Sequence, residues 1–200
     1  MTNPKAVRIT GGIWRSRRLV APKGQATRPT SDRVREALFS ILTSEGVFAS
    51  EGLAVLDLYA GSGALAFEAL SRGASRAVLV EQARDALAAI RANAKSLEAE
   101  IRVVATKVES AVEGLRGETF DLVLVDPPYI EVTRPKFADP LNTVATTLRP
   151  GGILVLEHSA TDEPPTILGL DVDRTWRYGD TALTLYVRAM ANAVVMETDD

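Results

Sequence analysis

Residues 53–63 read LAVLDLYAGSG, and this stretch decides the fold of the 200-residue chain. The apolar residues up to Leu58 predict a buried strand, because a strand covered on both faces is apolar throughout. Gly61 and Gly63 then allow a sharp turn and a close approach of the backbone to a ligand. A strand, a glycine turn and a following helix predict the first unit of an α/β sheet that binds its ligand at this edge.

The same alternation of strands and helices continues along the chain. We expect strands over 53–58, 76–81, 101–105, 120–125 and 152–157, and helices over 64–72, 83–97, 107–115 and 138–148. Residues 171–177 and 182–188 then predict an antiparallel pair with no helix between them. The pattern predicts an α/β fold: a Rossmann-like, doubly wound, mostly parallel seven-stranded sheet with a terminal antiparallel hairpin.

A small basic extension precedes this domain. Residues 6–20 predict two short extended pieces around Gly11-Gly12, which we expect to form a β-hairpin. The expected organisation is an N-terminal extension over 1–30, a Rossmann-like domain over 31–189 and a disordered tail over 190–200.

The charge of the chain is strongly asymmetric. Residues 1–35 hold nine basic residues against one acidic residue, a net charge of +8; since the whole chain carries -3, residues 36–200 sum to -11. A basic arm on an acidic body predicts a polyanionic partner, although a solvated basic tail would have the same composition. The predicted RNA-binding residues are Arg15, Arg17, Arg18, Arg28, Arg33 and Arg35.

Composition excludes several classes of protein. The chain has no cysteine, so disulfides and thiolate metal sites are excluded, and a reducing cytoplasm is the expected compartment. No apolar run approaches the roughly 20 residues that a membrane helix needs, and the N-terminus lacks a signal-peptide core. His158 is the only histidine, so we expect no transition-metal site and a locally satisfied side chain at the end of a strand.

The glycine turn carries the candidate cofactor site. The second expected strand ends at Glu81, eighteen residues after Gly63, where a carboxylate can accept hydrogen bonds from ribose hydroxyls. A carboxylate at Asp57 would repel a pyrophosphate, but it attracts the sulfonium and ammonium groups of S-adenosylmethionine. Glu109, which follows the third strand, is the candidate adenine neighbour. The predicted cofactor-binding residues are Asp57, Gly61, Ser62, Gly63, Glu81 and Glu109.

Other interpretations of these residues stay open. Gly61, Gly63 and Ala66 also fit the turn of a dinucleotide-binding protein, and a glycine turn can be purely structural. Asp57 can be a carboxylate satisfied by turn amides, and Glu109 can be an ordinary acidic residue at a helix N-terminus.

A second motif, Asp126-Pro127-Pro128-Tyr129, follows the strand expected over 120–125. Exocyclic amines of nucleobases are poor nucleophiles, because their lone pair is delocalised into the ring. The Asp126 carboxylate and the Pro127 carbonyl can accept the amino hydrogens, while the two prolines hold the backbone in place. Tyr129 offers a face on which a flipped or single-stranded base can stack. The predicted catalytic residues are therefore Asp126, Pro127 and Tyr129, and the predicted reaction is methyl transfer to a nucleobase amine.

With both motifs in place, the chain resembles the RsmD-like methyltransferases over nearly all of residues 7–188. Beyond the two general motifs, the resemblance depends on RITGGIWR at 8–15, RPTSDRVREALF at 28–39, GSGAL with EALSRGA across 61–74, and YGDT at 178–181. It implies a bacterial, cytoplasmic enzyme that methylates the N2 amino group of a guanine in 16S rRNA. Its partner would be the small ribosomal subunit or an assembly intermediate, with no membrane and no obligate protein partner.

Three rival functions remain at this point. A DNA amino-methyltransferase acting on adenine N6 or cytosine N4 would use the same Asp126–Tyr129 motif, although the chain shows no separate target-recognition domain. An NAD-dependent oxidoreductase is disfavoured by Asp57 and by that motif. A non-catalytic ribosome-assembly factor could keep the fold without the reaction.

Overall fold

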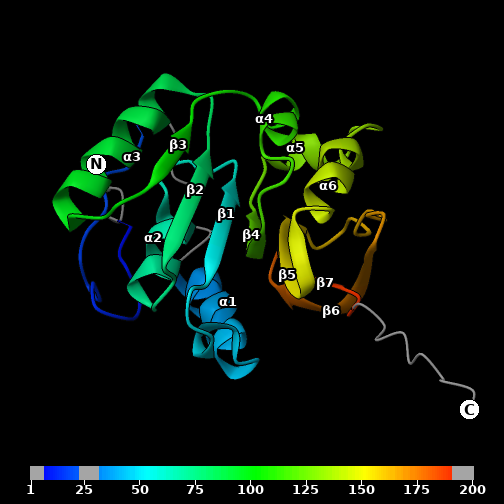
Figure 1. Cartoon of the computed structure of the whole chain (residues 1–200), viewed down its shortest axis with the longest axis horizontal. Helices are drawn as coiled ribbons and strands as arrows, with labels where there is room; N and C mark the ends of the chain where they lie inside the picture. The colour runs from blue at the N-terminus through cyan, green and yellow to red at the C-terminus, as the bar shows by residue number, and fades with distance from the viewer. Residues whose placement is uncertain (1–6, 23–31, 191–200) are drawn as a thin grey trace, which may run out of the picture.

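The centre of the molecule is a seven-stranded sheet (Figure 1). The computed structural model describes residues 7–22 and 32–190. Its strands are β1 (Ala54–Leu58), β2 (Arg76–Val80), β3 (Arg102–Val104), β4 (Phe120–Val125), β5 (Leu148–Ser159), β6 (Leu170–Tyr178) and β7 (Thr181–Arg188). The strand order is β3-β2-β1-β4-β5-β7-β6; the first five strands run parallel, and β7 is antiparallel to both β5 and β6. This topology confirms the predicted fold class.

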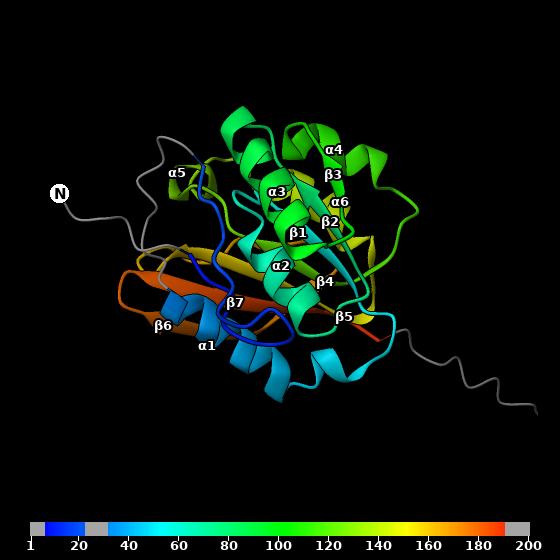
Figure 2. The ribbon, with the colours of Figure 1, turned by 90° about the vertical axis from the view of Figure 1, so that its left-hand side faces the viewer.

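Helices cover both faces of the sheet (Figures 1 and 2). They are α1 (Asp32–Ser44), α2 (Ala64–Ser71), α3 (Arg84–Leu97), α4 (Val108–Gly114), α5 (Tyr129–Val132) and α6 (Ala138–Ala145), with a short 3-10 helix over Val47–Ala49. Buried side chains of α1, α2 and α3 share one core with one face of the sheet, and those of α4 and α6 share a second core with the other face.

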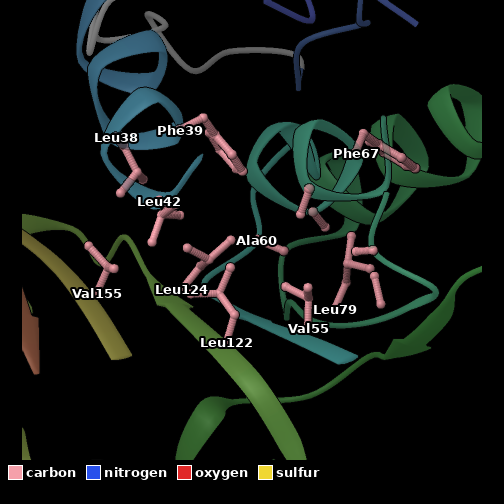
Figure 3. Close-up of a cluster of buried hydrophobic side chains, with 14 of the residues drawn as sticks. Leu38, Phe39, Leu42, Val55, Ala60, Phe67, Leu79, Leu122, Leu124 and Val155 are labelled. Carbon is pink, nitrogen blue, oxygen red and sulfur yellow. The ribbon is translucent and has the colours of Figure 1, made fainter. Parts of the chain in front are cut away.

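The apolar side chains on one face of α1 pack against the sheet. Leu38 and Leu42 project from α1 toward the sheet, where Leu122 and Leu124 of β4 lie, and Phe39 lies between α1 and α2 in the same core (Figure 3). Each of these side chains is at most 5% exposed, and burying one such side chain is worth about 1.5–3 kcal/mol. The helix that precedes the glycine turn is thereby held against the middle of the sheet.

β5 differs most from its expected bounds. β5 begins at Leu148 rather than at residue 152, because Leu148 already pairs with Phe120 of β4. A register irregularity follows before Ile153 pairs with Leu122. The helix expected over 138–148 is correspondingly shorter and ends at Ala145. Pro150, Gly151 and Gly152 are typical turn residues, so the sequence predicted that the strand would begin only after them.

The N-terminal segment, residues 7–22, packs on α2 and α3 (Figure 2). Its two arms run antiparallel, as the expected hairpin requires, with a β-bridge between Arg8 and Arg18. Backbone hydrogen bonds from Ile9 to Arg17, from Ser16 to Ile9 and from Leu19 to Val7 also join the arms. Near the turn, the amides of Thr10 and Gly11 donate to Glu68 and that of Ile13 donates to the carbonyl of Ser71, so the turn is attached to α2.

Glu68 is the centre of this attachment. Its fully buried carboxylate accepts hydrogen bonds from the Thr10 amide at 2.6 Å, the Thr10 hydroxyl at 2.7 Å and the Gly11 amide at 2.8 Å. It also pairs with Arg72 at 2.8 Å and lies 3.7 Å from Arg35 Nε. One buried charge therefore joins the N-terminal segment, α1 and α2.

Close contact explains the second glycine of the segment. Gly12 has a φ of 74°, and a Cβ at this position would lie 1.7 Å from the carbonyl oxygen of Ser71. Any side chain would push the turn away from the end of α2. Trp14 is partly buried and packs against the same core, which helps to hold the segment in place.

Some expectations fall outside this description. Arg28 and, apart from Met190, the tail expected over 190–200 lie outside the described residues. Among the helices that the structure does describe, none combines the length and the apolar character that crossing a membrane requires.

We predict that Glu68→Ala lowers the free energy of unfolding by about 3–5 kcal/mol, because it leaves buried donors and a buried guanidinium without their acceptor. Denaturant titration measures this loss. Hydrogen exchange of the Thr10 and Gly11 amides should accelerate in the same variant. Glu36→Ala, an exposed change on α1, is the control and should stay within about 0.5 kcal/mol of the parent. A loss below about 1 kcal/mol for Glu68→Ala would contradict the assignment.

Candidate active site

The two sequence motifs meet at one edge of the sheet. β1 and β4 are parallel neighbours, with Leu58 opposite Val125. The amide of Asp126 donates to the carbonyl oxygen of Leu58 at 3.5 Å, a long bond that links the two strand ends directly. The glycine turn after β1 and the Asp126–Tyr129 turn after β4 therefore lie side by side, as a transfer between them requires.

Asp57 lies beneath the glycine turn and is fully buried. Its Oδ2 accepts a hydrogen bond from the Ala66 amide at 3.1 Å, in the first turn of α2. Its Oδ1 has no hydrogen-bond partner among the described residues. Burial raises the pKa of Asp57 well above its usual range, the Ala66 amide opposes this shift, and the nearby Asp126 and Glu81 carboxylates add to it. A buried carboxylate with a free oxygen fits a cationic ligand, such as the ammonium and sulfonium groups of S-adenosylmethionine.

Glu81, one residue past β2, ties the glycine turn to its neighbouring strand. Its Oε2 accepts from the Gly61 amide at 2.9 Å, and its Oε1 accepts from the amides of Gln82 and Ala83, both at 2.7 Å. The sequence predicted a partner for ribose hydroxyls at this position. In the structure the carboxylate also fixes the conformation of the glycine turn through these hydrogen bonds.

The two glycine positions of the turn require glycine for different physical reasons. Gly61 has a φ of 56°, and a Cβ there would have open space around it, consistent with a backbone that faces a ligand. Gly63 has a φ of 78°, and its Cβ would lie 2.6 Å from the ring of Phe67. Packing under the turn, rather than contact with a ligand, thus requires the second glycine.

Asn93 of α3 connects the turn with the N-terminal segment. Its side-chain amide donates to the Ser62 carbonyl at 2.9 Å and to the Val20 carbonyl at 3.0 Å, and its Oδ1 accepts from the Val20 amide at 2.7 Å. The side chain is only 1% exposed. The predicted cofactor residue Ser62 is therefore held through its backbone by a residue that the sequence did not single out.

Glu109 lies exposed in the first turn of α4, the helix that follows β3. Burial raises the pKa of Tyr59 to about 12, and the negative charges of Glu109 and Glu131 contribute to this shift. Tyr59 follows β1 with a φ of 60°, a left-handed conformation that is rare for a residue with a side chain. Glu109 thus lies within electrostatic range of the residue that opens the glycine turn.

The catalytic candidates form a short, supported turn. Asp126 and Tyr129 are half-buried and Pro127 is buried. The Tyr129 hydroxyl makes a hydrogen bond of 2.8 Å to the hydroxyl of Thr181, the first residue of β7. The YGDT stretch between β6 and β7 therefore positions the aromatic ring that follows the two prolines.

A cavity of about 60 Å³ opens beside Asp126. Its lining comes from α1, from the start of α2 and from the ends of β4 and β5: Val34, Arg35, Leu38, Ala64, Leu65, Asp126 and Glu157. The last of these, Glu157, was not among the candidate residues named from the sequence. The available signal was the position of Glu157 at the end of a buried parallel strand, where ligand-binding residues gather.

His158 points away from this cavity. Its ring nitrogens lie 2.9 Å from the Ser159 carbonyl and 2.8 Å from the Thr184 hydroxyl. Burial lowers its pKa, so the neutral imidazole is favoured. Local hydrogen bonding accounts for this residue, as expected. Among residues 7–22 and 32–190, no group of three potential metal ligands comes together.

The predicted RNA-binding arginines divide into groups. Arg15, Arg17 and Arg18 are exposed on the N-terminal segment, and Arg17 donates to the Ser96 carbonyl at 2.6 Å. Arg33 is exposed on α1, next to the lining of the cavity. The turn that carries Arg15 packs at the C-terminal end of α2, roughly 11 Å along the helix from the glycine turn at 1.5 Å per residue.

Arg35 does not match the expectation of a phosphate contact. It is 7% exposed, its guanidinium donates to the Arg8 carbonyl and to Asp32, and it lies close to buried Glu68. A guanidinium enclosed in this way supports the attachment of the N-terminal segment and lines the cavity, rather than facing a polyanion in solvent.

The fold and the two adjoining turns define the Rossmann-like class of methyltransferases. The chain belongs to the family described as Conserved hypothetical protein 95, whose model matches residues 7–187. This match agrees with the resemblance to RsmD-like methyltransferases that the sequence motifs indicated.

Individual relatives carry related names. The chain is 43% identical over 124 residues to the Ribosomal RNA small subunit methyltransferase D of Escherichia coli K12, a match that spans 62% of this chain and 60% of that protein. It is 34% identical over 185 residues to the Putative rRNA methyltransferase YlbH of Bacillus subtilis, covering 90% of this chain and 98% of that protein. A solved structure, the putative methyltransferase yhhF from Escherichia coli, superposes with a TM-score of 0.78 at 33% identity, covering 93% and 99% of the two chains.

We predict that Asp57→Asn weakens S-adenosylmethionine binding by roughly 10- to 100-fold, the loss expected for a charge-assisted contact of about 1.5–3 kcal/mol. In the parent protein, affinity should rise with pH through the raised pKa of Asp57, because a cation prefers the ionised carboxylate. The variant should lose this part of the pH dependence. Calorimetric titration across pH measures both effects, and an unchanged affinity and pH profile would contradict the role of Asp57.

The stability of Asp57→Asn without cofactor provides a control, because it should stay equal or rise while the affinity for the cofactor falls. The folded-state pKa of Asp57 is raised, so the residue favours folding below its unfolded-state pKa and opposes it as the pH rises toward the folded-state value. In the absence of cofactor, Asp57→Asn should therefore be as stable as the parent or more stable at neutral pH. Weak binding combined with a lower melting temperature would indicate misfolding instead.

Proposed function

We propose that this protein transfers a methyl group from S-adenosylmethionine to the N2 amino group of a guanine in small-subunit ribosomal RNA. The observation that carries the proposal is the direct contact between the ends of β1 and β4. It brings a buried carboxylate suited to a cationic cofactor within electrostatic range of Asp126, the predicted acceptor of amino hydrogens.

The cofactor side of the site is built by the glycine turn. Asp57 would attract the positive groups, the backbone at Gly61 and Ser62 would face the ligand, and Glu81 holds the turn while keeping acceptor capacity for a ribose. Glu109, in the first turn of α4, would lie beside the adenine. When bound, S-adenosylmethionine supplies the electrophilic methyl group.

The base side is built by the turn after β4. The Asp126 carboxylate and the Pro127 carbonyl accept hydrogen bonds from the amino group and orient its nitrogen lone pair, so catalysis is mainly a matter of position. The ring of Tyr129, held by Thr181, offers the stacking face. A base must leave its helix to reach this turn, so the substrate nucleotide is flipped out or unpaired.

Two features favour ribosomal RNA as the substrate. Two of the proteins named above carry descriptions as rRNA methyltransferases, and the Bacillus subtilis one is matched over 98% of its length. The exposed arginines of the N-terminal segment provide a basic surface on an otherwise acidic chain. Phosphate contacts from such a surface position an RNA without reading its sequence.

We predict that Asp126→Ala lowers methyl transfer to undermethylated small subunits by at least about 100-fold, because the amino group loses its charged acceptor. Cofactor binding should persist, since removal of the Asp126 charge relieves its repulsion of Asp57. Asp171→Ala, an exposed change on β6, is the control and should keep parental activity. Full turnover by Asp126→Ala would disprove the catalytic assignment.

The substrate itself needs a direct test. Transfer of labelled methyl groups should occur to small subunits from a strain that lacks this protein, and mass mapping of that rRNA should find one guanine without its N2-methyl group. Efficient methylation of adenine or cytosine in duplex DNA, with none on small subunits, would favour the DNA amino-methyltransferase instead.

We also predict that Arg15→Gln combined with Arg18→Gln weakens subunit binding and reduces the salt dependence of affinity. The slope of log K against log salt should fall in magnitude by about 0.7–0.9 for each phosphate contact that is lost. Arg102→Gln with Arg116→Gln removes the same charge from exposed arginines that pair with glutamates elsewhere, and it should leave the slope unchanged. Equal slopes for both pairs would exclude the N-terminal segment as an RNA contact.

A further inference from the structure

Glu157 occupies a position equivalent to that of Asp126 on the neighbouring strand. β4 and β5 are parallel, and Val125 lies opposite Leu156, so the next residues, Asp126 and Glu157, continue side by side. Side chains alternate between the faces of a strand. Leu124 and Val155 belong to the core on the α1 side, which places the two carboxylates on that same face.

Both carboxylates line the cavity beside α1. Glu157 is 6% exposed, although it lies only two residues from the end of β5. At about 60 Å³ the cavity holds roughly four water molecules, which is the scale of one polar edge of a base. Apolar side chains of α1 and α2 form the rest of the lining, together with the buried guanidinium of Arg35, which balances part of the negative charge.

The pattern of acceptors matches one nucleobase. Guanine presents two kinds of donor next to each other, the N2 amino hydrogens and the N1 hydrogen. Adenine and cytosine also carry an amino group, but the adjacent ring nitrogen has a lone pair in place of a hydrogen. A second buried carboxylate beside Asp126 therefore attracts guanine and repels the other two bases.

We propose that Glu157 determines specificity for guanine by accepting the N1 hydrogen while Asp126 accepts from the N2 amino group. This inference rests on the proposed function and adds the recognised edge of the base to it. A site built to hydrogen-bond a substrate N–H discriminates strongly against an analogue without it, because its own buried acceptor is then left facing a lone pair. Glu157 thus acts through recognition, and Asp126 remains the residue that contacts the reacting amine.

The test compares guanine with 2-aminopurine, which keeps the amino group at C2 but has a lone pair at N1. Small subunits are reconstituted with rRNA that carries either base at the mapped nucleotide, and kcat/KM is measured for both. The parent protein should prefer guanine by at least about 100-fold. Glu157→Gln should lower activity on guanine and reduce the preference at least tenfold, because its side-chain amide can donate to the N1 lone pair.

Controls separate recognition from structure. Glu163→Gln makes the same chemical change at an exposed position six residues further along the chain, and it should keep the parental preference. Cofactor affinity and circular dichroism of Glu157→Gln should match those of the parent. If this variant fails to fold, equal use of the two bases by the parent protein would still overturn the proposal.

The outcomes are distinct. Equal methylation of guanine and 2-aminopurine by the parent protein would overturn the role of Glu157 while leaving the proposed function intact. A Glu157→Gln protein that is folded and keeps the full preference would do the same. If the parent protein transfers no methyl group to guanine in small subunits, both the proposed function and this inference fall.

Discussion

The parallel pairing of β1 with β4 is the constraint on which the candidate site depends. β1 lies between β2 and β4, at the point where the strand order reverses, and both of its neighbours contribute to the same edge. Glu81 comes from one side and Asp126 from the other, while Asp57 is buried between them. Burial raises the pKa of Asp57, and the neighbouring Asp126 and Glu81 carboxylates raise it further, so the site disfavours a negative charge that a bound cation would stabilise.

A second buried carboxylate connects this site with the N-terminal segment. Glu68 organises the backbone of Thr10 and Gly11, and Asn93 joins Val20 to the carbonyl of Ser62. The basic segment is therefore packed against the helices that carry the glycine turn, and its arginines are presented from a supported backbone. Preorganised contacts of this kind spend less binding energy on ordering the chain.

Local patterns predicted most of the fold and the two turns that meet at the candidate site. The apolar runs before Asp57 and Asp126 correctly identified buried parallel strands, because such runs survive only where both faces are covered. Two side chains were misjudged. Arg35 was counted as a surface cation, although its helical spacing to Leu38 and Leu42 places it on the buried face of α1. Glu157 was overlooked, since its nearness to Asp126 depends on the register between β4 and β5.

The sequence by itself determined the alternation of strands and helices, the glycine turn, the Asp126–Tyr129 motif and the charge asymmetry. These features depend on residues close together in the chain, where periodicity and turn chemistry act. Only the tertiary structure decided that β1 lies beside β4, that Glu68 captures the N-terminal segment and that Glu157 joins Asp126 in one cavity. Each of these contacts joins residues that are distant in sequence. They depend on strand register and on burial, which exist only in the folded chain.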